Sequence, residues 1–166
     1  LKTLVHRWRA QEQAILIGYN TMLNDNPQLT VREWTGRNPQ RFIVTDILPD
    51  EHFNIFGNDQ KTIVFNPIQN STTEKAEYIK LEFDKDLLKN ILNRLFEKNI
   101  SSVMIEGGRK VLESFISSGL WDEARVLTGN KTFGKGLPAP VLEFAQETER
   151  KEYDKDLMQI FIKQAL

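Results

Sequence analysis

"SVMIEGGRKVLESF", residues 102–115, changes from the pattern of a buried strand to that of an amphipathic helix across two adjacent glycines. The strand part is apolar without alternation, whereas Val111 and Phe115 recur at helical spacing. In open α/β sheets, ligands bind beyond the carboxyl ends of the strands, where a strand leads into a helix. Gly107 and Gly108 would let a ligand approach the backbone closely, and the free N–H groups of the helix start attract phosphate. The same two glycines also fit an ordinary tight turn, so the motif alone does not decide.

Further apolar runs bounded by turn residues predict the other strands of a sheet. They cover residues 14–17, 41–45, 61–65, 78–81, 123–128 and 157–162, in addition to 102–106. Several of these runs lack alternation, as parallel strands do when helices cover both of their faces. The sequence therefore predicts a mostly parallel central sheet.

Helical periodicity predicts three helices between or before these strands. They cover residues 1–11, 85–99 and 109–118. Asp84 is the expected N-cap of the second helix, and Gly119 is the expected C-terminal stop of the third. The alternation of helices and strands predicts one three-layer α/β domain over residues 1–166, with helices on both faces of the sheet. The last stretch before the closing strand is rich in Glu and Lys, which indicates a solvated hairpin or loop.

The composition excludes several classes of function. The net charge of −1 gives no long-range attraction to nucleic acid or to a membrane surface. The chain has no cysteine and only two histidines, which excludes thiolate chemistry and makes a metal site an unfavourable hypothesis. No apolar run approaches the roughly 18 residues that a membrane span needs. We therefore expect a cytoplasmic protein without a metal.

A second polar stretch, "GYNTMLNDNPQLTVR" at residues 18–32, follows the first predicted strand and so lies at the same edge of the sheet as the glycine pair. Thr21 and Asp25 share one face if this stretch is helical, and Arg32 offers a planar fork for a phosphate or carboxylate. Glu106 could accept hydrogen bonds from a ligand at the end of its strand. Each of these residues also fits a structural role: an Asx-rich cap, a surface arginine or an ordinary strand-end acid.

The combination of motifs is more specific than its parts. Residues 18–32 carry the spacing G-x-x-T-x-x-x-D-x-P-x-L-T-x-R, preceded by "RAQEQAILI" and followed by "NPQR", "EGG", "GLWDE" and "FGKG". This set resembles the reductase (C-terminal) domain of the bacterial bifunctional riboflavin-biosynthesis deaminase/reductases of the RibD family, within the dihydrofolate-reductase-like superfamily. The resemblance implies a dihydrofolate-reductase-like fold with an antiparallel C-terminal strand.

The resemblance also implies a reaction. NADPH would deliver a hydride to C1′ of the ribose of a phosphorylated ribosylaminopyrimidine, 5-amino-6-(5-phosphoribosylamino)uracil, to give the open-chain ribitylamino product. The family's catalysis is largely positioning, which agrees with the lack of an obvious nucleophile here. A homodimer, and a deaminase domain fused upstream in the parent protein, are implied by the same resemblance.

Site residues are carried over by position from the family. The substrate-binding residues implied are Arg9, Leu29, Arg32 and Glu106. The cofactor-binding residues implied are Thr21, Asp25, Gly107, Gly108, Arg109, Lys110, Val111, Leu112, Glu113 and Ser114. No catalytic proton donor is identified, and Asp25 and Glu106 are the available carboxylates.

Two features depart from the family. The usual first strand with a K-x-A-x-S-x-D-G pattern and the W-I-S segment after it do not occur in this sequence. We therefore expect a reductase domain that lacks its N-terminal strand and turns over more slowly than a full-length version. The pair Thr45-Asp46 follows the second strand, and an acid beside the adenosine ribose favours NADH, so the expectation of NADPH rests on the family.

Alternative functions stay open on the sequence. One is another dihydrofolate-reductase-like enzyme acting on a pteridine or on the pyrimidine before deamination. Another is a non-catalytic nucleotide-binding domain that keeps the fold. Nucleic-acid binding has no support, because basic residues are dispersed among acids, and Trp8 lies on the apolar face of its helix, where it is expected in the core.

Overall fold

The computed structural model describes residues 1–57, 59–131 and 134–164. The chain divides into two compact units, one formed by Lys2–Val111 and the other by Leu1 with Leu112–Leu166. Each unit has its own sheet. The predicted mostly parallel α/β architecture is confirmed, but the strands of the described chain form two sheets where the sequence predicted one.

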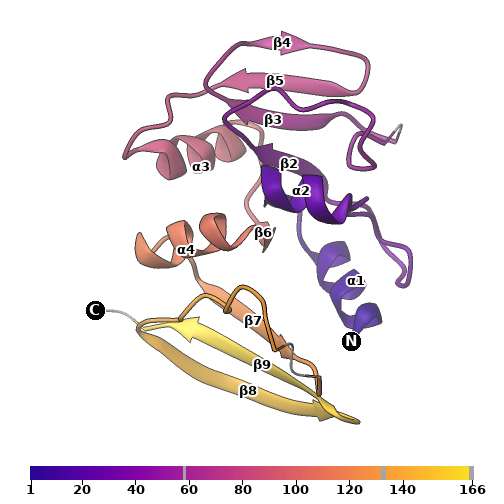
Figure 1. Ribbon diagram of the computed structural model, residues 1–166, viewed down its shortest axis with the longest axis vertical. Helices are drawn as coiled ribbons and strands as arrows, with labels where there is room; N and C mark the ends of the chain where they lie inside the picture. Colours follow the sequence, from indigo (N-terminus) through magenta and orange to yellow (C-terminus); the bar gives the residue numbers. More distant parts are fainter. Residues whose placement is uncertain (58, 132–133, 165–166) are drawn as a thin grey trace. The chain divides into compact units, whose positions relative to one another are not determined.

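The first unit contains a six-stranded sheet in the order β4-β5-β3-β2-β1-β6, of which all strands but β1 are labelled in Figure 1. The strands are β1 (Ala14–Gly18), β2 (Gln40–Val44), β3 (Thr62–Asn66), β4 (Ser71–Thr72), β5 (Ala76–Lys80) and β6 (Val103–Gly107). The helices are α1 (Lys2–Gln11), α2 (Tyr19–Asp25), α3 (Leu87–Glu97) and α4 (Arg109–Ser117), the last of which crosses the boundary between the units. All neighbouring strands are parallel except β4, which is antiparallel to β5 and was not predicted.

β1 lies between β2 and β6, and the whole strand is buried. Its apolar residues from Ala14 to Ile17 have no solvent exposure, as expected for a parallel strand covered on both faces. Met22 of α2 and Tyr78 of β5 belong to the same hydrophobic cluster. β1 thus ends at the carboxyl end of the sheet, and α2 begins there directly after Gly18.

A register shift distinguishes the pairing of β6 with β1. Leu16 is opposite Ile105, but the next residue, Ile17, is opposite Gly107. Glu106 is therefore the extra residue of a bulge on β6. Bulges re-aim side chains and are frequent next to active sites. This irregularity sets the direction of the carboxylate that the sequence singles out.

The second unit contains a three-stranded antiparallel sheet in the order β7-β9-β8. β7 (Glu123–Thr128) and β9 (Asp156–Lys163) match two predicted strands, and the predicted antiparallel C-terminal strand is β9. β8 (Ala145–Tyr153) occupies the stretch predicted as solvated hairpin or loop, and it forms a hairpin arm. Its largely exposed, charged residues suit an edge strand, which charge protects from unwanted pairing.

The ends of two helices test the capping predictions. Asp84 is not the N-cap of α3, because the helix begins at Leu87 after Asp86, and the Asp84 carboxylate instead accepts the Asp86 N–H at 2.9 Å. Gly119 follows α4 with φ +66°, and its N–H bonds to the Ile116 carbonyl at 3.0 Å. Gly119 is therefore the stop that the sequence predicted.

A buried arginine ties β2 to the loop before β3. The side chain of Arg41 is 1% exposed and forms a forked ion pair with Asp59 at 2.8 and 3.1 Å. The Arg41 guanidinium also donates to the Gln60 carbonyl at 2.8 Å. The hydrogen bonds and charge of Arg41 hold the pKa of Asp59 below the usual range.

In the described part of the chain, no helix is long and apolar enough to cross a membrane.

Candidate active site

The twin-glycine corner packs directly against α2. A Cβ atom placed on Gly107 would come within 2.8 Å of the Thr21 Cγ2, and one placed on Gly108 within 3.4 Å of the Thr21 hydroxyl. The same atom on Gly108 would lie 3.5 Å from the backbone nitrogen of Gly18. The corner after β6 and the segment after β1 are thus side by side, as the sequence predicted from the sheet edge.

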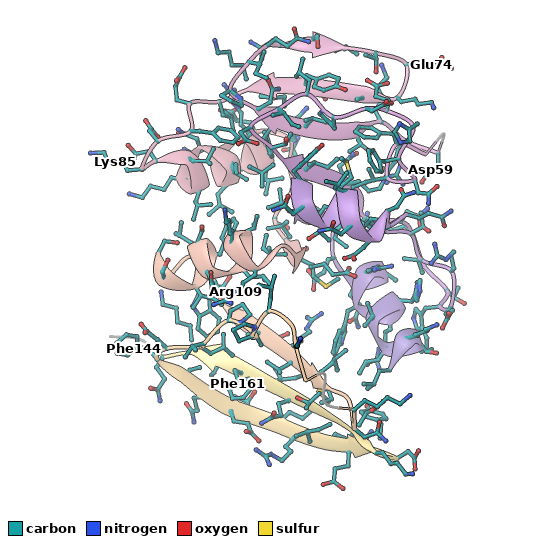
Figure 2. All side chains as sticks on the ribbon, viewed as in Figure 1. Asp59, Glu74, Lys85, Arg109, Phe144 and Phe161 are labelled. Atoms are coloured by element: carbon teal, nitrogen blue, oxygen red, sulfur yellow. The ribbon has the colours of Figure 1, made fainter. Side chains whose placement is uncertain are left out.

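Backbone conformation makes glycine necessary at this corner. Gly108 has φ +84°, which side-chain-bearing residues rarely adopt. Arg109, labelled in Figure 2, is the first residue of α4 and follows Gly108 directly. A Cβ atom on Gly18 would meet the Val111 side chain at 2.8 Å, so the first turn of α4 also packs against the end of β1. Two glycines and the start of a helix therefore meet at the carboxyl ends of β1 and β6, and backbone N–H groups at such a helix start are suited to binding an anion.

Arg9 and Glu106 form a forked ion pair between α1 and β6. The Arg9 Nε donates to Oε2 of Glu106 at 2.8 Å, and its Nη2 donates to Oε1. The side chains are only 11% and 26% exposed. The remaining nitrogen of Arg9, Nη1, donates to the Thr30 carbonyl at 3.3 Å. Two residues predicted to bind substrate are thus in contact, although 97 positions separate them along the chain.

Arg32 lies in the irregular segment after α2, and its guanidinium is exposed. Its Nη1 donates to the Gln28 side chain and, at 3.3 Å, to the Thr30 hydroxyl. The residue lines a shallow hollow of about 510 Å³ together with Thr3, Glu33, Trp34 and Thr35. An exposed arginine in a concave surface is suited to binding an anion.

Leu29 is buried in the core, whereas Asp25 lies on the helical turn that the sequence predicted. The Leu29 side chain is 2% exposed and belongs to the hydrophobic core. Its backbone has φ +55°, which shapes the turn leading to Thr30 and Arg32. Asp25 is exposed in the last turn of α2, four residues after Thr21 on the same helix. Trp8 is 8% exposed and belongs to the core, as predicted.

One residue of this region was missed by the sequence reasoning. His6 is buried in α1, and its Nδ1 accepts the backbone N–H of Arg32 at 3.1 Å. The signal was present in the sequence, because His6 precedes Arg9 by three positions and must share its face of the helix. A polar residue on a buried helix face needs a partner, and here that partner is the segment that carries Arg32.

The arrangement is chemically suited to two kinds of ligand. The glycine corner and the α4 start offer backbone donors and close approach, which fit the phosphates of a dinucleotide. Arg9, Glu106 and Arg32 offer charged groups of both signs for a polar, phosphorylated molecule. Another hollow, of about 560 Å³, is lined by residues such as Lys80, Asn90 and Arg94 and contains none of the predicted site residues.

Comparison with known proteins agrees with this geometry. The sequence profile described as "RibD C-terminal domain" matches residues 1–155. The riboflavin biosynthesis protein RibD of Aquifex aeolicus is 35% identical over 145 residues, which cover 82% of this chain and 40% of that protein. The 2,5-diamino-6-ribosylamino-4(3H)-pyrimidinone 5′-phosphate reductase of Methanothermobacter thermautotrophicus is 32% identical over 133 residues, 74% of this chain and 61% of that protein.

A solved structure agrees as well. The diaminohydroxyphosphoribosylaminopyrimidine deaminase/5-amino-6-(5-phosphoribosylamino)uracil reductase of Thermotoga maritima superposes with a TM-score of 0.85 at 29% identity, over 98% of this chain and 48% of that one. The chain therefore spans about half the length of the relatives it matches. Because the profile match covers nearly the whole sequence, this chain belongs to the RibD C-terminal domain family.

Proposed function

We propose that this chain is a reductase of riboflavin biosynthesis that uses NADPH to reduce the ribosyl group of 5-amino-6-(5-phosphoribosylamino)uracil. The observation that carries the proposal is the position of the Arg9–Glu106 pair. Glu106 immediately precedes Gly107, which packs against Thr21, so the groups assigned to the substrate adjoin those assigned to the cofactor. Hydride transfer needs this proximity, because the two reacting carbons must meet within van der Waals distance.

The residues of the corner fit a nicotinamide dinucleotide. The cofactor residues assigned from the resemblance extend along α4 to Ser114, and of these Gly107, Gly108 and the first turn beginning at Arg109 would hold its phosphates through backbone N–H groups. Thr21 would contact the cofactor from α2, with Asp25 one turn further along the same helix. When bound, the reduced nicotinamide supplies the hydride that adds to C1′ of the sugar.

The substrate would be held by the charged groups of Arg9, Glu106 and Arg32, next to the glycine corner that is assigned to the cofactor. Arg32 would bind the 5′-phosphate, because its planar guanidinium is exposed and can donate two parallel hydrogen bonds. Both oxygens of Glu106 accept hydrogen bonds from Arg9, which fixes the carboxylate and leaves its other lone pairs for N–H or hydroxyl groups of the substrate. Leu29 would contribute through the backbone of its turn. These residues act by orienting the substrate.

A second candidate substrate is the diaminopyrimidinone that precedes deamination. The Methanothermobacter relative, at 32% identity, is named for the reduction of that compound. The two pyrimidines differ in one exocyclic group, so a single contact could decide between them.

The family's usual homodimer is also proposed here, and light scattering of the purified chain tests it.

The proposed function is tested by following NADPH absorbance in separate assays with the deaminated pyrimidine and with the diaminopyrimidinone that precedes deamination. We expect oxidation of NADPH that depends on one of the two phosphorylated pyrimidines. Arg32→Ala should raise KM for that substrate at least about tenfold, as expected when a charged hydrogen bond is lost. Arg94→Ala is the matched control, because Arg94 forms an exposed pair with Glu97 on α3. Saturable binding of NADPH without any oxidation would instead favour a non-catalytic nucleotide-binding domain.

A further inference from the structure

His6 is a buried imidazole to which the proposed chemistry gives no task. It is 6% exposed and lies on the buried face of α1 with Trp8 and Arg9. The only hydrogen bond that joins it to the segment after α2 in the described structure is the one from the Arg32 N–H to its Nδ1, at 3.1 Å. An imidazole nitrogen accepts a hydrogen bond only when it carries no proton, so this contact requires neutral His6 with its proton on Nε2.

The segment around Arg32 is attached to α1 at several points. The Thr30 carbonyl accepts from Arg9, and a Cβ atom on Gly36 would come within 2.5 Å of the Cβ of Ala10. These contacts lie on either side of Arg32 along the chain. Among the hydrogen bonds of the described residues, the one to His6 joins α1 to the backbone of Arg32 itself. α1, which carries Arg9 to its partner Glu106, therefore also fixes the position of the Arg32 backbone.

The position of this backbone matters because the Arg32 guanidinium is exposed and ends a long, flexible side chain. A side chain of this kind binds an anion more tightly when its starting point and direction are fixed beforehand. We propose that His6 is a positioning residue for the substrate phosphate: it holds the Arg32 backbone so that the guanidinium is directed to the phosphoryl group. This inference rests on the proposed function, which assigns Arg32 to that phosphate.

The expected signature is a defect that depends on the phosphate. His6→Ala should weaken binding of the phosphorylated ribosylaminopyrimidine about tenfold, because an Arg32 side chain that is no longer held in place must be ordered when the phosphate binds. Binding of the dephosphorylated ribosyl compound, and of NADPH, should stay within about twofold of wild type. His6→Asn should restore most of the affinity, because the Asn Oδ1 takes the place of Nδ1 as an acceptor. In an Arg32→Ala background, His6→Ala should have no further effect on the phosphorylated ligand.

Isothermal titration calorimetry of the whole chain tests these expectations with two pyrimidines, the phosphorylated ribosylaminopyrimidine and its dephosphorylated form. Thermal unfolding of each variant checks that it is folded. Equal losses for both pyrimidines, no loss at all, or a folded His6→Asn variant that binds as weakly as His6→Ala would overturn the role of His6. Binding of the phosphorylated pyrimidine without NADPH oxidation would refute the proposed function, while the same titrations would still decide the role of His6. Wild-type protein that binds both pyrimidines equally would overturn the inference about His6 alone. Wild-type protein that binds neither would overturn both.

Discussion

The Arg9–Glu106 pair makes a quantitative prediction about stability. Glu106→Gln removes the charge that compensates the Arg9 guanidinium, which is 11% exposed, but keeps an oxygen that can accept one hydrogen bond. Breaking a fully buried ion pair costs about 3–5 kcal/mol, and breaking an exposed one costs about 0–1 kcal/mol. Because Glu106 is 26% exposed, we expect a loss between these limits, about 2 kcal/mol. For a chain of this length that loss lowers Tm by about 4–8 °C.

Thermal unfolding followed by circular dichroism measures this change. Glu97→Gln is the control, because it breaks the Arg94–Glu97 pair, whose side chains are 46% and 59% exposed. The control should lower Tm by no more than about 1 °C, since exposed pairs contribute little. A double-mutant cycle with Arg9→Met then isolates the interaction between Arg9 and Glu106, and we expect a coupling of at least about 1 kcal/mol. If Glu106→Gln unfolds at the same temperature as the control, or if the two site mutations are additive, the pair does not join α1 to β6 as described.

Three further perturbations probe the corner, the turn and the buried arginine. Gly108→Ala, at φ +84°, should cost about 1 kcal/mol in a urea titration and weaken NADPH binding measured by fluorescence; unchanged affinity would remove the corner from the cofactor site. Leu29→Ala should cost about 2–5 kcal/mol, because a side chain that is 2% exposed leaves a cavity; a loss below about 0.5 kcal/mol would show that the turn is not packed in the core. Arg41 lowers the pKa of Asp59, so the stability that this pair contributes is fully present above the ordinary Asp pKa of about 4 and is lost as pH falls through the lowered value. Asp59→Asn should therefore be less stable than wild type at neutral pH, with a difference that shrinks in acid, and a difference independent of pH in urea titrations would contradict the assignment.

The strands that carry the site could be predicted because their burial leaves a clear pattern. β1 is a continuous apolar run that ends at Gly18, and β6 is an apolar run that ends in Glu106 and Gly107; both appear in the structure within one residue of their predicted bounds. The helical turn with Thr21 and Asp25 is also present, as α2. Because the carboxyl ends of parallel strands share one edge, the proximity of Thr21 and Gly107 followed from the order of the elements.

Long-range pairing explains most of what the sequence did not predict. Arg41 stands within an apolar strand, and no local pattern indicates that its partner is Asp59, 18 positions later. The bulge at Glu106 depends on the register with β1, which the residues of β6 alone do not specify. Leu29 was assigned to the ligand by its position in a motif, whereas its apolar side chain is held in the core. The separation of β7, β8 and β9 into a second sheet likewise depends on strand pairing.

Transfer of deuterium from the reduced cofactor to the product tests most directly whether one site binds a dinucleotide beside a phosphorylated sugar. NADPH carrying deuterium at the transferable position is incubated with the phosphorylated pyrimidine and an excess of the protein, and the product is analysed by mass spectrometry and NMR. We expect a ribitylamino product with one deuterium, located at C1′. A product without deuterium at C1′, or no product while both ligands bind, would contradict the proposed reductase.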